Sequence, residues 1–102
     1  MDSKYNRIAE ILRTFEKSLD DKHEIGLLFP LAFEAAPLAV TRGCGEDFIL
    51  FELVGKNGET FTVVQNYSQI NFAIVALPTK TQPRRLGFRP DNHHEEASTS
   101  EM

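Results

Sequence analysis

Residues 48–65, FILFELVGKNGETFTVVQ, consist of two apolar stretches on either side of a short polar turn. The stretches Phe48–Val54 and Thr60–Gln65 are rich in β-branched and aromatic residues, which favour strands. Asn57-Gly58 between them is a strong signal for a two-residue hairpin turn, because both residues tolerate positive φ. The pattern therefore predicts an antiparallel hairpin.

This turn also predicts how the two strands pair. With Asn57-Gly58 as its central residues, Phe61 faces Val54 and lies on the more polar side of the hairpin, beside Glu52 and Gln65. A slip of one residue would move Phe61 to the other face.

The residues before the hairpin predict one helix and two strands. Ser3 is a suitable N-cap for a helix that runs to about Leu19. One face of this helix is apolar and comprises Tyr5, Ile8, Ile11, Leu12, Phe15 and Leu19. The apolar face packs on the chain's own sheet or, as the alternative, also pairs with the same helix of a second subunit.

After the helix the apolar residues alternate with a period of two over Ile25–Phe33, which indicates a strand. Pro30 lacks a backbone donor and indicates an edge strand or a bulge. Leu38–Arg42 is predicted to be a short second strand, followed by a loop at residues 43–46, GCGE.

Beyond the hairpin, Ile70–Leu77 predicts a further strand with Asn71 and Phe72 on opposite faces. Residues 79–90, TKTQPRRLGFRP, are irregular but contain apolar side chains, which indicates a docked segment. We expect one α+β domain over residues 1–90, a helix on a mostly antiparallel sheet of four to five strands with a C-terminal basic arm. Residues 91–102 have almost nothing to bury and are predicted to be a disordered acidic tail.

The distribution of charge is more informative than its total. The chain of 102 residues has a formal net charge of −4, which by itself argues against a polyanionic partner. The last twelve residues, however, hold Asp91, Glu95, Glu96 and Glu101 and no Lys or Arg, so the rest of the chain is neutral. Segment 60–90 contains no Asp or Glu at all.

Four basic residues of that acid-free segment lie within ten positions: Lys80, Arg84, Arg85 and Arg89. A guanidinium group binds phosphate through two parallel charge-assisted hydrogen bonds. This predicts an anion-binding arm for a phosphorylated ligand. The alternative is a solvated basic segment that pairs with the acidic tail or with Glu residues of the sheet.

Phe61 and Asn71 form a second candidate pair. An aromatic ring on a semi-polar sheet face can stack on a nucleobase, and an asparagine can make two hydrogen bonds to an adenine edge. The structural alternatives are a core or dimer-interface ring for Phe61 and a loop-to-strand hydrogen bond for Asn71.

Features of catalytic or metal sites are sparse. Cys44 is the single cysteine, so an internal disulfide and a cysteine-based zinc site are excluded. No histidine is near Cys44 in sequence. The predicted helix is followed by Asp20, Asp21 and His23. Acidic residues at a helix end are more often solvated than bound to a metal. We therefore predict no catalytic residues, no metal and no cofactor. Without an apolar stretch that spans a membrane, the protein is expected to be cytoplasmic and to have no membrane partner.

The stretches SQINFAIVALP (residues 68–78) and PRRLGFR (residues 83–89) resemble a small bacterial and phage domain family. They are also similar to the first type of phage Thoeris anti-defence sponges. The resemblance extends over about residues 15–89. It implies non-enzymatic capture of a cyclic nucleotide immune signal, such as a cyclic ADP-ribose isomer, in the cytoplasm of an infected bacterial cell. It also implies a homodimer, or a hexamer built from dimers.

The resemblance implies roles for individual residues. The family uses an aromatic that stacks on adenine and an asparagine ten residues later, which Phe61 and Asn71 match. It uses two arginines four apart, which Arg85 and Arg89 match, and Arg42 corresponds to an arginine of a second site. Two alternatives stay open, namely a structural or protein-interaction domain that forms homo-oligomers and a small nucleotide hydrolase.

The acidic tail generates a first prediction. If the tail lies over the empty basic arm, deletion of residues 91–102 removes a competitor and tightens the binding of a cyclic nucleotide, most at low salt. Titration calorimetry at two salt concentrations measures this. An unchanged affinity would mean that the tail is only a solubilising extension.

Overall fold

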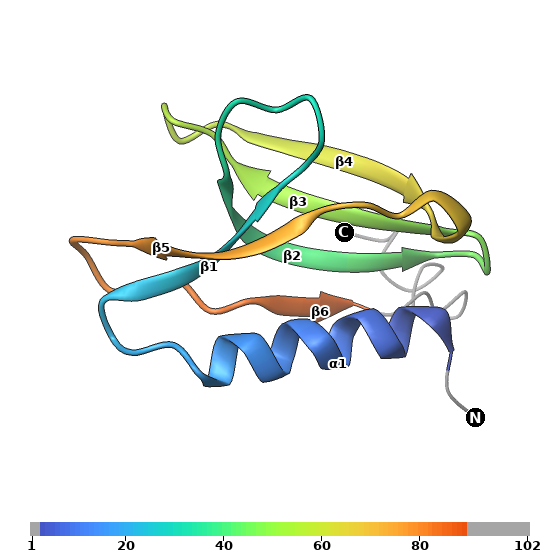
Figure 1. Ribbon diagram of the computed structural model, residues 1–102, viewed down its shortest axis with the longest axis horizontal. Helices are drawn as coiled ribbons and strands as arrows, with labels where there is room; N and C mark the ends of the chain where they lie inside the picture. The colour runs from blue at the N-terminus through green and yellow to red at the C-terminus, as the bar shows by residue number, and fades with distance from the viewer. Residues whose placement is uncertain (1–2, 90–102) are drawn as a thin grey trace, which may run out of the picture.

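The computed structural model describes residues 3–89 and confirms an α+β fold with one helix packed on a mostly antiparallel sheet (Figure 1). The elements are α1 (Lys4–Lys17), β1 (His23–Leu28), β2 (Ala36–Cys44), β3 (Phe48–Val54), β4 (Thr60–Asn66), the 3₁₀ turn η1 (Tyr67–Gln69), β5 (Ala73–Pro78) and β6 (Gly87–Arg89). The acidic tail predicted for residues 91–102 lies outside the described residues.

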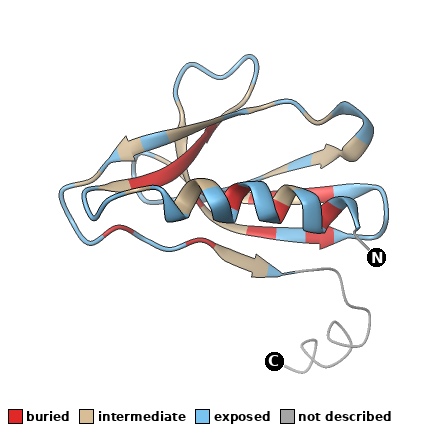
Figure 2. Cartoon of the chain, turned by 60° about the horizontal axis from the view of Figure 1, so that its bottom comes forward, coloured by how far each residue is buried: buried red, intermediate tan, exposed pale blue. Residues whose placement is uncertain are grey.

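Helix α1 begins at the predicted cap, because the Ser3 side chain accepts a hydrogen bond from the Asn6 N–H at 3.0 Å. The helix ends at Lys17, two residues before the predicted end at Leu19. Its buried side chains are Tyr5, Ala9 and Leu12, and Figure 2 shows α1 buried along one side only. None of the described helices is long and apolar enough to cross a bilayer.

The sheet has the order β4-β3-β2-β1-β5, and β2 is shared between its two halves. Ala36 and Pro37 of β2 pair with β1, whereas Val40–Arg42 pair in parallel with β6 along the other part of the strand. The register of β2 against β3 shifts between Leu38 and Val40. In Figure 1 β1 and β5 cross over the face of β2 and β3, while β6 lies beside α1.

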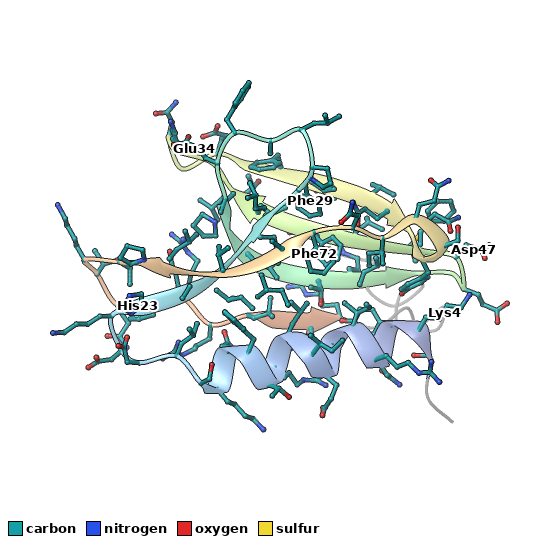
Figure 3. All side chains as sticks on the ribbon, viewed as in Figure 1. Lys4, His23, Phe29, Glu34, Asp47 and Phe72 are labelled. Atoms are coloured by element: carbon teal, nitrogen blue, oxygen red, sulfur yellow. The ribbon has the colours of Figure 1, made fainter. Side chains whose placement is uncertain are left out.

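Three phenylalanine rings fill the space between the two halves of the sheet. Phe51 of β3 is fully buried and contacts Phe29, which follows β1, and Phe72, which precedes β5. The ring centroids are 5.1–5.7 Å apart in tilted and edge-on arrangements, which aromatic pairs prefer. The labels in Figure 3 mark Phe29 and Phe72.

The predicted hairpin exists, but its register is displaced by one residue. Gly55 and Glu59 are joined by a backbone hydrogen bond, and Gly58 alone carries positive φ, at 84°, so the loop has three residues and not two. Phe61 consequently pairs with Leu53 and not with Val54. The prediction that Phe61 shares a face with Glu52 was wrong, because the additional loop residue reverses the faces.

Two other strand predictions need correction. The strand expected over Ile25–Phe33 ends at Leu28, and it lies between β2 and β5 and not at an edge. Pro30 falls in the loop after β1, where its missing donor is harmless. The strand expected from Ile70 begins at Ala73, because residues 70–72, which follow η1, are irregular.

Gly26 in the centre of β1 generates the second prediction. A Cβ atom there would overlap the Leu77 side chain and lie 3.1 Å from the Ala36 carbonyl oxygen. We expect Gly26→Ala to lower the free energy of unfolding by about 1–3 kcal/mol, measured by urea denaturation. Gly87→Ala is the matched control, since its Cβ would have an ordinary contact of 3.5 Å with Val40. Equal stability of the two variants would contradict the predicted packing.

Candidate functional site

The part of the predicted basic arm that the structure describes, residues 79–89, is docked on the fold, and Arg84 is part of the anchor. Its backbone N–H and its guanidinium donate to the two carboxylate oxygens of Glu24, each at 3.2 Å. Glu24 is buried at 7% exposure, so its carboxylate requires these donors. Arg84 therefore pairs with a Glu residue of the sheet, which is the alternative to a role in anion binding.

Helix α1 contacts the part of the arm that comes after Arg84 in the chain. The Leu86 N–H donates to the Glu16 carboxylate at 2.8 Å, and Leu86 itself is buried in the core. The Arg13 guanidinium lies 4.2 Å from the centre of the Phe88 ring. These contacts hold Gly87–Arg89 against β2 as the short parallel strand β6.

Arg42 and Arg89 are direct neighbours across the β2–β6 pair. Both are exposed, on the face of the sheet that also carries Leu50. Arg42 forms an ion pair with Glu52, whereas no ion pair among residues 3–89 involves Arg89 or the exposed Arg85. The arm thus leaves Arg85 and Arg89 available to an anion, and the structure adds Arg42 next to Arg89.

Asn71 lies in a different part of the molecule, at the rim of a shallow pocket of about 370 Å³. Its backbone N–H donates to the Gln65 side chain at 3.3 Å. The pocket is formed where the loop after β1 passes the residues that enter β5. Its lining comprises Leu28, Phe29, Pro30, Leu31, Ala32, Asn71, Phe72 and Ala73. Seven of these eight residues are apolar, Asn71 is the polar one, and the pocket is open to solvent.

One chain does not bring the arginines and the base-binding candidates together. Arg89 is on β6 and Phe61 is on β4, with β2 and β3 between them, which corresponds to about 14 Å at the usual strand spacing. Phe61 also lies on the face of Leu53, opposite to the face of Arg42. The homodimer implied by the resemblance, in which residues of two copies could meet, stays a prediction.

The remaining candidates do not form a metal site within the described residues. His23 Nδ1 lies 2.7 Å from the Asp20 carboxylate, and this hydrogen bond lowers the pKa of Asp20 from its ordinary value. No group of three or more acidic, histidine or cysteine side chains there is arranged to hold an ion. Cys44 is an exposed thiol at the end of β2.

Comparison of the chain with protein-family models, with curated proteins and with solved structures finds no match.

Sequence reasoning missed Glu24 as the anchor of the arm and Leu31 as a pocket residue. A sequence signal for Glu24 existed, because it directly precedes the apolar stretch at residues 25–29. The structure places it inside β1, where residues 24–27 are buried. No comparable signal marks Leu31, whose position depends on the chain leaving β1 after Leu28 with φ of 75° at Leu31.

The two adjacent arginines generate the third prediction. Arg84→Ala leaves the buried Glu24 carboxylate without its charged donor and is expected to lower the free energy of unfolding by about 1–3 kcal/mol. Arg85→Ala, the matched control, is expected to change it by less than about 0.5 kcal/mol. Urea denaturation measures both. A larger loss for Arg85→Ala would show that the arm is anchored differently.

Proposed function

We propose that this protein binds a cyclic nucleotide signal, such as a cyclic ADP-ribose isomer, without cleaving it and thereby inhibits host anti-phage defence. The observation that carries the proposal is the position of Asn71. Asn71, which the family resemblance places in the ligand pocket and whose amide can hydrogen-bond an adenine edge, is one of the residues that line a shallow pocket. The place of action is the cytoplasm of the infected bacterial cell.

The chemistry of the pocket suits a purine. Phe29 and Phe72 supply flat apolar surface, and the Asn71 side chain is an amide that can donate to and accept from a base edge. Phosphates require cations, for which Arg85 and Arg89 are the available groups. Because these arginines lie away from Asn71 in one chain, the proposal includes a homodimer, or a hexamer of dimers, whose second copy supplies them. Phe61 stacks on the base in the same assembly.

The pocket lining supports binding rather than turnover. None of the eight residues that line it is ionisable. A hydrolase of the same ligand would need a general acid or base within hydrogen-bond reach of the bond to be cleaved.

A second candidate function is a protein-interaction domain that forms homo-oligomers. The full exposure of Leu31 and Phe33 favours it, since single-chain globular domains seldom leave two large apolar side chains uncovered at one loop. The two functions are compatible if the ligand site needs a second copy.

Native mass spectrometry with cyclic ADP-ribose isomers and cyclic di- and trinucleotides tests the proposal. We expect a stoichiometric complex for at least one ligand, and we expect Asn71→Ala to weaken it at least about tenfold through the loss of two hydrogen bonds. Arg85→Ala/Arg89→Ala is expected to weaken it further, since hydrogen bonds to charged groups contribute about 1.5–3 kcal/mol each.

Asn57→Ala in the hairpin loop is the matched control and is expected to bind as the wild type does. Ligand released by denaturing the protein should have its original mass. Altered mass would indicate the hydrolase alternative, and the absence of any complex would contradict the proposed function.

A further inference from the structure

Strand β4 is one of the two outer strands of the sheet, and within the described residues no strand lies on its open side. Figure 1 shows β4 as the outermost strand of its half of the sheet. An outer strand presents a row of unpaired N–H and C=O groups that can pair with another chain. Proteins usually block such a row with lysine, proline, a bulge or a covering segment, so an open row is informative.

The register of the hairpin determines which backbone groups of β4 point outward. The Gly55 N–H donates to the Glu59 carbonyl, and beyond the other end of β4 the Tyr67 N–H donates to the Asp47 carbonyl. In an antiparallel pair, residues that bond to the neighbouring strand alternate with residues whose N–H and C=O point away from it. The odd-numbered residues of β4 therefore bond to β3. The outward-pointing residues are Thr60, Thr62, Val64 and Asn66. Within residues 3–89, no hydrogen bond reaches the N–H or C=O groups of these four.

The two outer strands of the sheet differ in how well they are blocked. The sequence of β4, TFTVVQN, contains no charged residue, proline or glycine, and its pairing with β3 continues without a bulge. On β5 the Thr79 N–H donates to the Lys22 carbonyl, which sets the same alternation there. The outward-pointing residues of β5 are Ile74, Ala76 and Pro78. Since proline has no N–H, the row on β5 is incomplete, whereas the row on β4 is complete.

Acidic side chains flank β4 at both of its ends. Glu59 directly precedes the strand, and Asp47, labelled in Figure 3, directly precedes Phe48, the residue that pairs with Asn66 at the other end. Glu59 and Asp47 are exposed, and no ion pair among residues 3–89 involves either of them. The open edge of the sheet thus has a neutral centre and negatively charged ends.

We propose that β4 binds an extended segment of a partner protein by strand addition, and that this segment is uncharged at its centre and has lysine or arginine at its ends. Hydrogen bonds from its main chain to the outward-pointing groups of β4 supply the affinity, and its alternate side chains supply the specificity. On one face the segment packs beside Phe61, and on the other face beside Thr62 and Val64. Its basic ends lie close to the carboxylates of Glu59 and Asp47.

Charge argues against two other occupants of this edge. Two copies of β4 that pair antiparallel about a two-fold axis would place the Glu59 end of each strand beside the Asp47 end of the other, so that acidic groups gather at both ends. Residues 91–102 of this chain hold four acidic residues and no Lys or Arg, so they would add negative charge to the same edge. A partner segment with basic ends avoids both conflicts.

Amide hydrogen exchange of the full chain, measured by NMR, locates the binding site. The probe is a synthetic peptide of the length of β4, with alternating threonine and valine and one lysine at each end. We expect it to slow exchange of the Thr60, Thr62 and Val64 amides at least about tenfold and to leave Ile74 and Ala76 of β5 unchanged. Protection of β4 that needs no peptide and rises with protein concentration would make a second copy the occupant and overturn the inference.

Three variants test the backbone pairing and the charge separately, with fluorescence polarisation of the labelled peptide as the measurement. Thr62→Pro removes an outward N–H without removing a bond to β3, and we expect it to abolish binding. Ala76→Pro makes the same change on β5 and, as the matched control, should bind as the wild type does.

Asp47→Lys/Glu59→Lys changes only exposed side chains, so it tests the inference even if a proline variant does not fold. The wild type should prefer the lysine-ended peptide over the same peptide with glutamate ends at least about tenfold at low salt, and this double variant should reverse the preference. A wild type that binds neither peptide, a preference that the charge reversal leaves unchanged, or wild-type binding by Thr62→Pro contradicts the inference.

Discussion

The packing of three phenylalanine rings is the interaction on which the rest of the structure depends. Phe51 comes from β3, and Phe29 and Phe72 come from the ends of β1 and β5, so the rings join the two halves of the sheet where few backbone hydrogen bonds do. Phe29 and Phe72 also line the candidate pocket. The contact that stabilises the fold therefore also places Asn71 beside the loop after β1.

The basic arm is held on the fold by the ion pair between Glu24 and Arg84. A buried carboxylate must be paired, and Glu24 is paired with both the backbone and the guanidinium of Arg84. The ion pair between Glu24 and Arg84 stabilises the fold and positions the chain that continues into β6. In β6, Arg89 lies beside Arg42 of β2. Arg84 thus contributes to stability, whereas the exposed Arg85 and Arg89 stay candidates for the anion binding that we propose.

Much of the fold could be predicted because local patterns are strong in this chain. The cap at Ser3, the amphipathic helix and the strand pair around Gly58 depend on interactions between residues close in sequence. The register of the hairpin could not be predicted in the same way. A two-residue and a three-residue loop both suit a glycine with positive φ, and only the packing of Leu53 and Phe51 against the rest of the core decides between them.

The sequence by itself determined the fold class, the acid-free basic arm and the choice of Asn71 and the arginines as candidates, because composition and periodicity are local properties. Only the tertiary structure decided that Arg84 is held by Glu24, that Phe61 faces away from Arg42 and that Asn71 borders a pocket. These relations join residues far apart in the chain, and they follow from strand order and burial. The same reason applies to Leu31 and Phe33, whose alternating pattern suits a strand but whose backbone leaves the sheet and exposes both side chains.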